Sequence, residues 1–266
     1  MDLAARSFHV SLKPLLPQVV GLSLLLLLAS GTSALTTGNL APLALVAAIP
    51  ITVALHEALH AVTALALGAK VSGLTLAKAG RLVVGVGIVL GSMPLRQWLL
   101  VTLAPLFSSP ILLILSRLDT PLAPLLASTY LYNAVGSAGD LAFALLVAPS
   151  RAARVIDMGD QLRVEDGELR LWSLYLLDFL GFFGLALLFV APLALLAAAW
   201  TQGRLELLGL LIAEISRLQN RDGVTIVARA GPGLPAAALL ASAAFEALTG
   251  RRRVTGLRQA FLRHHG

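Results

Sequence analysis

The sequence predicts an all-α polytopic integral membrane protein with five or six transmembrane helices and small β-hairpins in its cytoplasmic loops. The first observation is composition: 58% of the 266 residues are hydrophobic and only 13% are charged, about half the charged share of a soluble domain. The second is where the charges lie. Residues 14–69 contain one charged residue, Glu57, and residues 97–116 contain none. A helical span needs about 20 mostly apolar residues, so these windows are long enough to cross a bilayer.

Five spans follow from the charge-poor windows, at roughly 16–36, 41–68, 97–116, 122–149 and 171–199. The segment 205–218 carries Glu206 and Glu214 and is short, so we expect an interfacial or packed helix there, with a sixth span as the alternative. The first span also fits a signal peptide, because Arg6 and Lys13 precede an apolar run that ends in small residues at 29–34.

Basic loops predict the orientation in the cell membrane. The loops 69–96 and 150–170 are rich in Lys and Arg, whereas the loop 37–40 has no charge, so the two basic loops and the N-terminus are expected in the cytoplasm. The net charge of +6 then indicates contact with lipid headgroups of the bilayer and not nucleic-acid binding. The tail 251–263 is basic too, which suggests the inside, although five spans would place it outside.

Two loops are expected to form β-hairpins. In 70–92, valine-rich runs surround a glycine-containing turn, a pattern typical of strands. In 161–171, Leu162 and Val164 lead to an Asp-Gly turn at Asp166, and Leu169 and Leu171 follow it, which predicts a second small hairpin.

The second span contains His56-Glu57-Ala58-Leu59-His60, an H-E-x-x-H pattern. Histidines four residues apart lie one above the other on one helix face, so their imidazoles can bind one Zn²⁺. Glu57 sits beside them and can take a proton from a water molecule that the metal activates. The chain has no cysteine, and its other histidines lie at the termini. The alternative is a buried polar cluster used for helix packing or proton transfer.

A catalytic zinc needs a third protein ligand and an open position. No Glu occurs between Glu57 and Glu165, so within the expected spans only Asp140 and Asp178 remain as ligands. Asp178 follows Arg170 closely and is better explained as a near-interface acid or a hydrogen-bond partner between helices.

Asp140 has the stronger context as the third ligand. It shares a helix face with Asn133, seven residues earlier, and the small residues at 136–139 allow another helix to approach closely. The spans of His60 and Asp140 both run inward, and both residues lie about 12–14 Å from the inner end of their span at 1.5 Å per residue. The two side chains can therefore meet.

These residues resemble the site-2 protease class of intramembrane zinc metalloproteases. Over roughly residues 40–165 the chain is more similar to a family of membrane zincin peptidases known as a domain of unknown function. The shared features are H-E-x-x-H, a Leu-Ala-Pro turn at 103–105, the Asn133…Asp140 pair and the segment 155–160. The Pro and Leu usual between Asn and Asp in the site-2 class are absent, and no insertion is large enough for a PDZ domain.

The resemblance implies Zn²⁺ held by His56, His60 and Asp140, with Glu57 as the general base and Asn133 as a substrate- or transition-state-binding residue. It also implies that the 70–92 hairpin offers an edge to an unwound substrate strand. Residues 1–200 would be a membrane-embedded zincin-like metallopeptidase domain, and residues 201–266 a basic helical tail. The expected substrates are membrane proteins or membrane-adjacent peptides.

Two alternatives stay open. The chain can be a non-catalytic multi-pass membrane protein, either a transporter or a scaffold. It can also be a zinc peptidase of the membrane-anchored CAAX or heat-shock type, in which a downstream Glu is the third ligand; Glu165 and Glu168 are the candidates.

Overall fold

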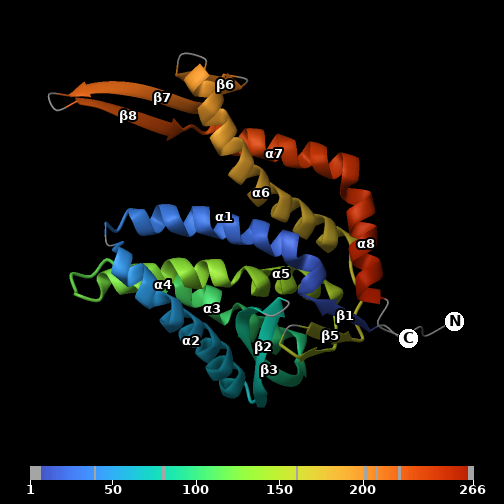
Figure 1. Ribbon diagram of the computed structural model, residues 1–266. Coiled ribbons are helices and arrows are strands. Elements are labelled where there is room, and N and C mark those ends of the chain that lie inside the picture. Colours follow the sequence, from blue (N-terminus) through green and yellow to red (C-terminus); the bar gives the residue numbers. More distant parts are fainter. Residues whose placement is uncertain are drawn as a thin grey trace.

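A computed structural model describes residues 7–38, 40–79, 82–159, 161–200, 203–207, 209–220 and 223–262. It combines long helices with two small antiparallel sheets (Figure 1). Six helical segments in the described part of the chain are long and apolar enough to cross a membrane, which is compatible with a multi-pass membrane protein. They cover Lys13–Leu35, Pro42–Ala66, Leu95–Leu115, Ala123–Ser150, Leu171–Trp200 and Gly233–Leu262.

Four of these segments are built around single helices, and two are interrupted. The uninterrupted helices are α1 (Leu16–Leu35), α2 (Pro42–Ala66), α3 (Leu95–Leu115) and α6 (Leu171–Trp200). The fourth segment consists of α4 (Ala123–Gly136) and α5 (Ala138–Val147), which meet at Ser137. In the sixth, a π-helical turn at Glu246–Gly250 joins α7 (Gly233–Phe245) to α8 (Arg251–Leu262). The five expected helices are confirmed, and a sixth is added to them.

The sixth segment returns the chain to the end of the molecule where it began. Helix α8 lies beside β1 (Phe8–Ser11) in Figure 1, and its residues Val254, Leu257 and Phe261 are buried in the same core as Phe8. Six crossings would place the basic tail on the same side as the N-terminus, so the conflict that five expected spans created would not arise. The division of the chain at residue 200 stays a prediction.

The larger sheet has the strand order β1-β5-β4-β3-β2, and all neighbours are antiparallel. The expected 71–90 hairpin is confirmed as β2 (Val71–Ala79) and β3 (Leu82–Pro94), with β2 at the edge. The expected hairpin at 161–171 is wrong. Strand β5 (Gln161–Glu165) pairs with the preceding β4 (Arg154–Asp157) and with β1, not with residues after it.

The reason lies in the single buried face of β5. Leu162 and Val164 are fully buried, and Val164 lies opposite Val155 of β4 in the same core. Asp166 then adopts φ +53°, which ends the strand, and the residues after it lead into α6. The strand before β5 therefore offers it a buried apolar partner, while the turn at Asp166 leads the following residues toward α6.

The expected helix at 205–218 is also wrong. This segment forms β6 (Arg204–Leu207) and β7 (Leu210–Asn220), which make a second sheet with β8 (Gly223–Ala230) in the order β6-β7-β8. Gly203 and Gly209 have φ of +96° and +77°, a region that glycine enters at little cost. Gly203 follows the end of α6, and Gly209 lies in the turn between β6 and β7. The apolar content of the segment did not indicate these turns.

Helices α1 and α6 pack in direct backbone contact. A Cβ built on Gly21 would lie 1.8 Å from the carbonyl oxygen of Gly181, and one built on Gly184 would lie 1.9 Å from that of Gly21. Small residues allow this close approach between helices. The contact fixes α6 against the N-terminal half of the bundle, on the far side of α1 from α2 (Figure 1).

Candidate metal centre

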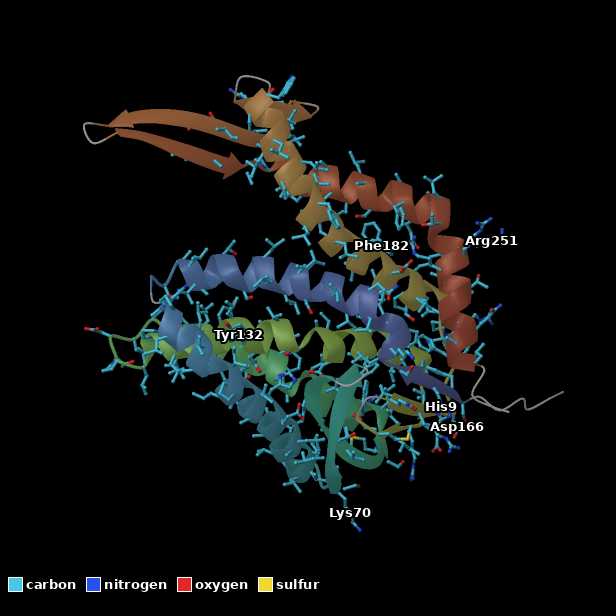
Figure 2. The ribbon with its side chains drawn as sticks, in the orientation of Figure 1. His9, Lys70, Tyr132, Asp166, Phe182 and Arg251 are labelled. Atoms are coloured by element: carbon cyan, nitrogen blue, oxygen red, sulfur yellow. The ribbon has the colours of Figure 1, made fainter. Side chains whose placement is uncertain are left out.

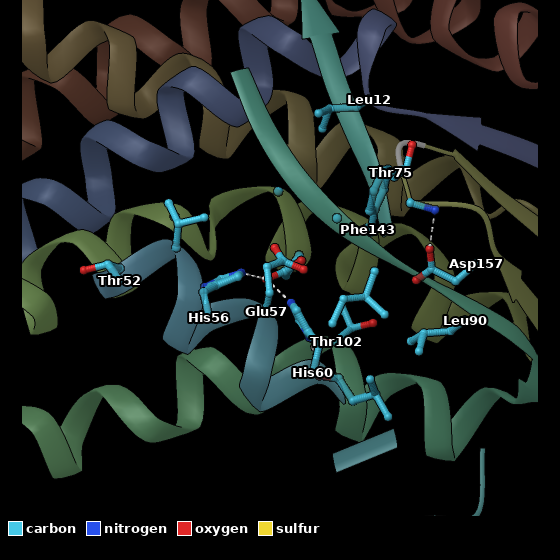
Figure 3. Close-up of a pocket in the computed structure, with 18 of the residues that line it drawn as sticks. Leu12, Thr52, His56, Glu57, His60, Thr75, Leu90, Thr102, Phe143 and Asp157 are labelled. Carbon is cyan, nitrogen blue, oxygen red and sulfur yellow. Dashed lines mark hydrogen bonds and ion pairs between the residues drawn. The ribbon is translucent and has the colours of Figure 1, made fainter. Parts of the chain in front are cut away.

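His56 and His60 lie on successive turns of α2 (Figure 3). Asp140 comes to them from the first turn of α5. The Nε2 atoms of His56 and His60 lie 3.1 and 3.5 Å from Oδ2 of Asp140. One donor atom from each of the three residues lies within 4.8 Å of the others. The two histidines that the spacing selected and the expected third ligand, Asp140, are therefore brought together.

The break between α4 and α5 positions the carboxylate. A Cβ built on Gly136 would lie 3.9 Å from Nδ1 of His56, so the end of α4 passes very close to the imidazole. Asn133 and Asp140 were expected on one continuous helix face. The helix is interrupted at Ser137, yet both residues face His56: Asn133 contacts Nδ1 and Asp140 contacts Nε2.

The amide of Asn133 fixes the ring of His56. Asn133 Nδ2 donates to the carbonyl oxygen of Pro105 at 2.6 Å and to Ser109 Oγ at 2.9 Å. Because the nitrogen faces these acceptors, Oδ1 is the atom that lies 3.2 Å from His56 Nδ1 and accepts its proton. A neutral His56 ring therefore carries its proton on Nδ1, which leaves the lone pair of Nε2 facing Asp140.

A backbone carbonyl group orients the ring of His60. His60 Nδ1 lies 2.8 Å from the carbonyl oxygen of Val101 on α3 and donates to it. In a regular helix this carbonyl would accept the N–H of residue 105, but that residue is Pro105 and has no N–H. The Leu103-Ala104-Pro105 sequence was expected as a turn. It lies inside α3 instead, where the proline leaves the Val101 carbonyl free.

The three donor groups fit a divalent metal ion. With both Nδ1 atoms donating away from the centre, the two Nε2 atoms and a carboxylate oxygen face one another, and a metal cation between them would bind all three. Asp140 Oδ2 is buried without a hydrogen-bond partner among the described residues. Two imidazoles and one carboxylate are a donor set that zinc commonly uses. His56, His60 and Asp140 would therefore hold the ion.

Glu57 lies in the same cavity but outside this donor set. It follows His56 by one residue, so its side chain leaves α2 in another direction and faces β3. The backbone of Ile88 on β3 lies near its carboxylate in the cavity lining, and Oε2 is buried without a partner in the described part of the structure. Glu57 thus has a buried carboxylate oxygen that can accept a proton.

A cavity of about 540 Å³ contains the centre. Thr52 lies at one end of it, the donor set in the middle and Asp157 at the other end (Figure 3). Asp157 Oδ1 accepts from the backbone N–H of Gly159 at 2.8 Å, and Oδ2 accepts from Trp98 Nε1 at 3.2 Å. Burial raises the pKa of Asp157 to about 6, although these two hydrogen bonds oppose the shift.

Glu165 and Glu168, the ligands that the CAAX-type alternative requires, do not line this cavity. Glu165 forms an ion pair with Arg163, and Glu168 forms one with Arg170. Neither of these two glutamates is therefore positioned as a third ligand.

Asp178 has a structural environment, as its position near Arg170 suggested. It is fully buried, accepts from Gln18 Nε2 at 2.7 Å and from Arg253 Nε at 2.9 Å, and is absent from the cavity.

Arg253 also pairs with Glu246 at 2.6 Å and lies over the rings of Phe182 and Phe245. Phe182 faces the C-terminal helices, whereas Arg251 points away from the molecule (Figure 2). This cluster joins α8 to α6 and α1.

Three contributors to the site were not identified from sequence. Val101 acts through a backbone carbonyl, which leaves no trace in the residue type. Pro105 was noted only as part of a turn, and Asp157 only as part of the shared segment 155–160.

No curated protein and no solved structure matches the chain. Residues 49–153 match the model of a family described as "Putative zincin peptidase". The matched stretch is less than half of the chain; it contains His56, Glu57, His60, Asn133 and Asp140 and ends before Asp157. The match supports a zincin-like metallopeptidase family and, with it, zinc as the metal for the donor set of His56, His60 and Asp140.

Proposed function

We propose that the protein is a membrane-embedded, site-2 protease-like zinc metallopeptidase that hydrolyses peptide bonds of membrane or membrane-adjacent substrates. The observation that carries the proposal is the convergence of His56, His60 and Asp140 from two helices, with Glu57 beside them in one cavity. A third ligand that follows an Asn in a distant helix is the feature that the resemblance to the site-2 class implies.

A zinc ion at this centre would polarise the peptide carbonyl and lower the pKa of a water molecule to about 7. Glu57 takes a proton from the water molecule while the water oxygen bonds to the carbonyl carbon of the peptide. As the C–N bond breaks, Glu57 passes that proton to the leaving nitrogen, so one carboxylate serves first as base and then as acid. Glu57 lines the same cavity as the three donor residues, so it is close enough for both transfers.

The membrane location is supported by what the helices expose. Leu43 of α2, Leu196 of α6 and Leu248 after α7 are 82%, 68% and 84% exposed, which is unfavourable in water and favourable in lipid. The β2–β3 hairpin supports the substrate class. Strand β2 is an edge strand, Thr75 on it lines the cavity, and β3 contacts Glu57, so an extended substrate segment can add to this edge next to the centre.

Metal content and cleavage, measured together, test the proposal. The purified wild-type chain should hold about one zinc and cleave an unfolded membrane-type peptide. Glu57→Gln should keep the zinc and lose cleavage, because the amide cannot take a proton. His56→Ala, His60→Ala and Asp140→Ala should lose both, whereas Asp119→Ala, a change in an exposed loop acid, should lose neither.

Two results would end the peptidase proposal. One is a wild-type chain that binds no zinc when it is supplied. The other is Glu57→Gln with wild-type cleavage. A transporter or scaffold predicts no separation between Glu57 and the other three residues.

A further inference from the structure

We infer that Asp157 forms a subsite for a positively charged side chain, Lys or Arg, of the substrate. The inference rests on the proposed function, since it assigns a substrate class to the same cavity. It concerns a residue that is outside the donor set and outside the stretch matched by the family model.

The first argument is the position of the carboxylate. Asp157 ends β4 and faces the cavity from the end opposite Thr52, beside Leu90 (Figure 3). The cavity therefore runs from the interior of α2, past the centre, to a carboxylate on the sheet. A peptide whose scissile bond lies at the centre would place a neighbouring side chain near Asp157.

The second argument is that the carboxylate is held in place but not neutralised. Its two described partners, the Gly159 N–H and Trp98 Nε1, are uncharged donors. A carboxylate offers about four acceptor positions, so each oxygen can accept a further hydrogen bond. Gly159 sits at φ +92° and a Cβ there would meet Thr75 Cγ2 at 2.1 Å, so the loop that orients Asp157 is packed tightly against β2.

The third argument is the charge of the cavity. Its described lining contains three carboxylates, Glu57, Asp140 and Asp157, and neither Lys nor Arg. A divalent cation at the centre would balance Glu57 and Asp140. The charge of Asp157 would remain, in a site where an unpaired buried charge is unfavourable. An ammonium or guanidinium group from a substrate provides the missing charge and the donors.

The proposed location agrees with this substrate class. Membrane proteins carry Lys and Arg just beyond the cytoplasmic ends of their spans, and the sheet with Asp157 is on the side expected to be cytoplasmic. Leu90 and Trp98 line the same part of the cavity, where they can cover the aliphatic stem of a Lys or Arg side chain.

The test is a positional scan with the zinc-loaded full-length chain. One peptide is made with Lys, and a second with norleucine, at each position around the cleaved bond, and kcat/KM is compared within each pair. We expect the wild type to prefer Lys at one position by about tenfold, which corresponds to about 1.4 kcal/mol. In Asp157→Asn this ratio should fall to about one. In Asp157→Lys, a Glu peptide should be cleaved faster than its norleucine counterpart.

Asp166→Asn is the matched control. It removes the same charge from an exposed acid outside the cavity, at φ +53°, a conformation that Asn tolerates, so the Lys preference should stay at its wild-type value. A wild type without a Lys preference at any position overturns the inference and leaves the peptidase proposal standing. An Asp157→Asn protein that slows both peptides of each pair equally also overturns it, because that is the effect of a purely structural residue.

A binding measurement keeps the inference testable if no peptide is cleaved. Zinc-loaded Glu57→Gln should bind the Lys peptide about tenfold more tightly than the norleucine peptide, and adding Asp157→Asn should abolish the difference. Equal binding of the two peptides to Glu57→Gln contradicts the subsite. Absence of cleavage by the zinc-loaded wild type contradicts the proposed function instead.

Discussion

His60 Nδ1 lies 2.8 Å from the carbonyl oxygen of Val101, and this carbonyl lacks its helical partner because residue 105 is proline. Groups that orient a metal-binding histidine set its tautomer and raise its basicity. Pro105 in α3 thus leaves a carbonyl group that orients the expected metal ligand His60 on α2. His56 uses a side-chain amide for the same purpose, so the two rings are held by unrelated groups.

Pro105→Ala should separate helix stability from metal affinity. Alanine restores an N–H that competes with His60 for the Val101 carbonyl, so zinc affinity should fall by up to about tenfold, the lower end of the range for such outer partners. The helix itself should not be weakened, because alanine is favoured over proline inside a helix by about 3 kcal/mol. Chelator competition and thermal unfolding measure the two quantities on the same sample.

Pro110→Ala is the control for this experiment. Pro110 also lies inside α3, but it is exposed and does not line the cavity. It should leave zinc affinity unchanged. If both alanine variants lower the affinity equally, the effect comes from the shape of the helix and not from the Val101 carbonyl.

Features that depend on residues close in sequence could be predicted, whereas features that depend on tertiary packing could not. His56, Glu57 and His60 were selected by helical spacing alone. Asp140 was selected as an acid in an expected span, with small neighbours and a depth that matches His60, so the tertiary fold was not needed to choose it. The role of Val101 depends on which helix packs against α2, and the local sequence does not specify this tertiary contact. The strands at 204–220 were missed because their apolar residues do not distinguish strand from packed helix, and positive φ at two glycines decided the outcome.

Asn133 is predicted to act on the centre through His56. In the structure it is fully buried, and its amide bonds Pro105, Ser109 and His56. Asn133→Ala removes the acceptor for His56 Nδ1, so zinc affinity should fall by about 10- to 100-fold. Chelator competition measures the affinity.

Ser108→Ala gives the comparison for Asn133. Ser108 Oγ lies 3.3 Å from Asn133 Nδ2, and its loss leaves the contact with His56 in place, so affinity should change little. If Asn133→Ala instead keeps wild-type zinc affinity and raises only KM, the substrate-binding role implied by the family resemblance is the correct one.

Arg253 is predicted to hold the C-terminal helices on the bundle. Its guanidinium lies 2.8 Å from Asp178, which is fully buried. Arg253→Met leaves that carboxylate without its charged partner, which should lower the free energy of unfolding by roughly 3–5 kcal/mol. Zinc content of the folded fraction should not change, because the cluster lies outside the cavity.

Arg252→Met is the matched substitution for Arg253. The neighbouring arginine is exposed, and such a surface change should alter stability by no more than about 0.5 kcal/mol. Denaturant titration in detergent compares the two variants. Equal stability of Arg253→Met and the wild type would show that the ion pair does not hold α8 in place.

The last prediction concerns orientation, and the cysteine-free chain makes it simple to measure. Single cysteines at Thr37, Lys78 and Arg229 report on the α1–α2 loop, the β2–β3 hairpin and the second sheet. With the basic loops in the cytoplasm and six crossings, an impermeant thiol reagent added to intact cells should label positions 37 and 229 and leave 78 protected. Position 229 is decisive for the number of crossings, because α6 must leave the membrane on the same side as α1. Label at 78 with protection at 37 would show that the orientation is the opposite of the expected one. Protection at 229 with label at 37 would show that α6 does not cross the membrane.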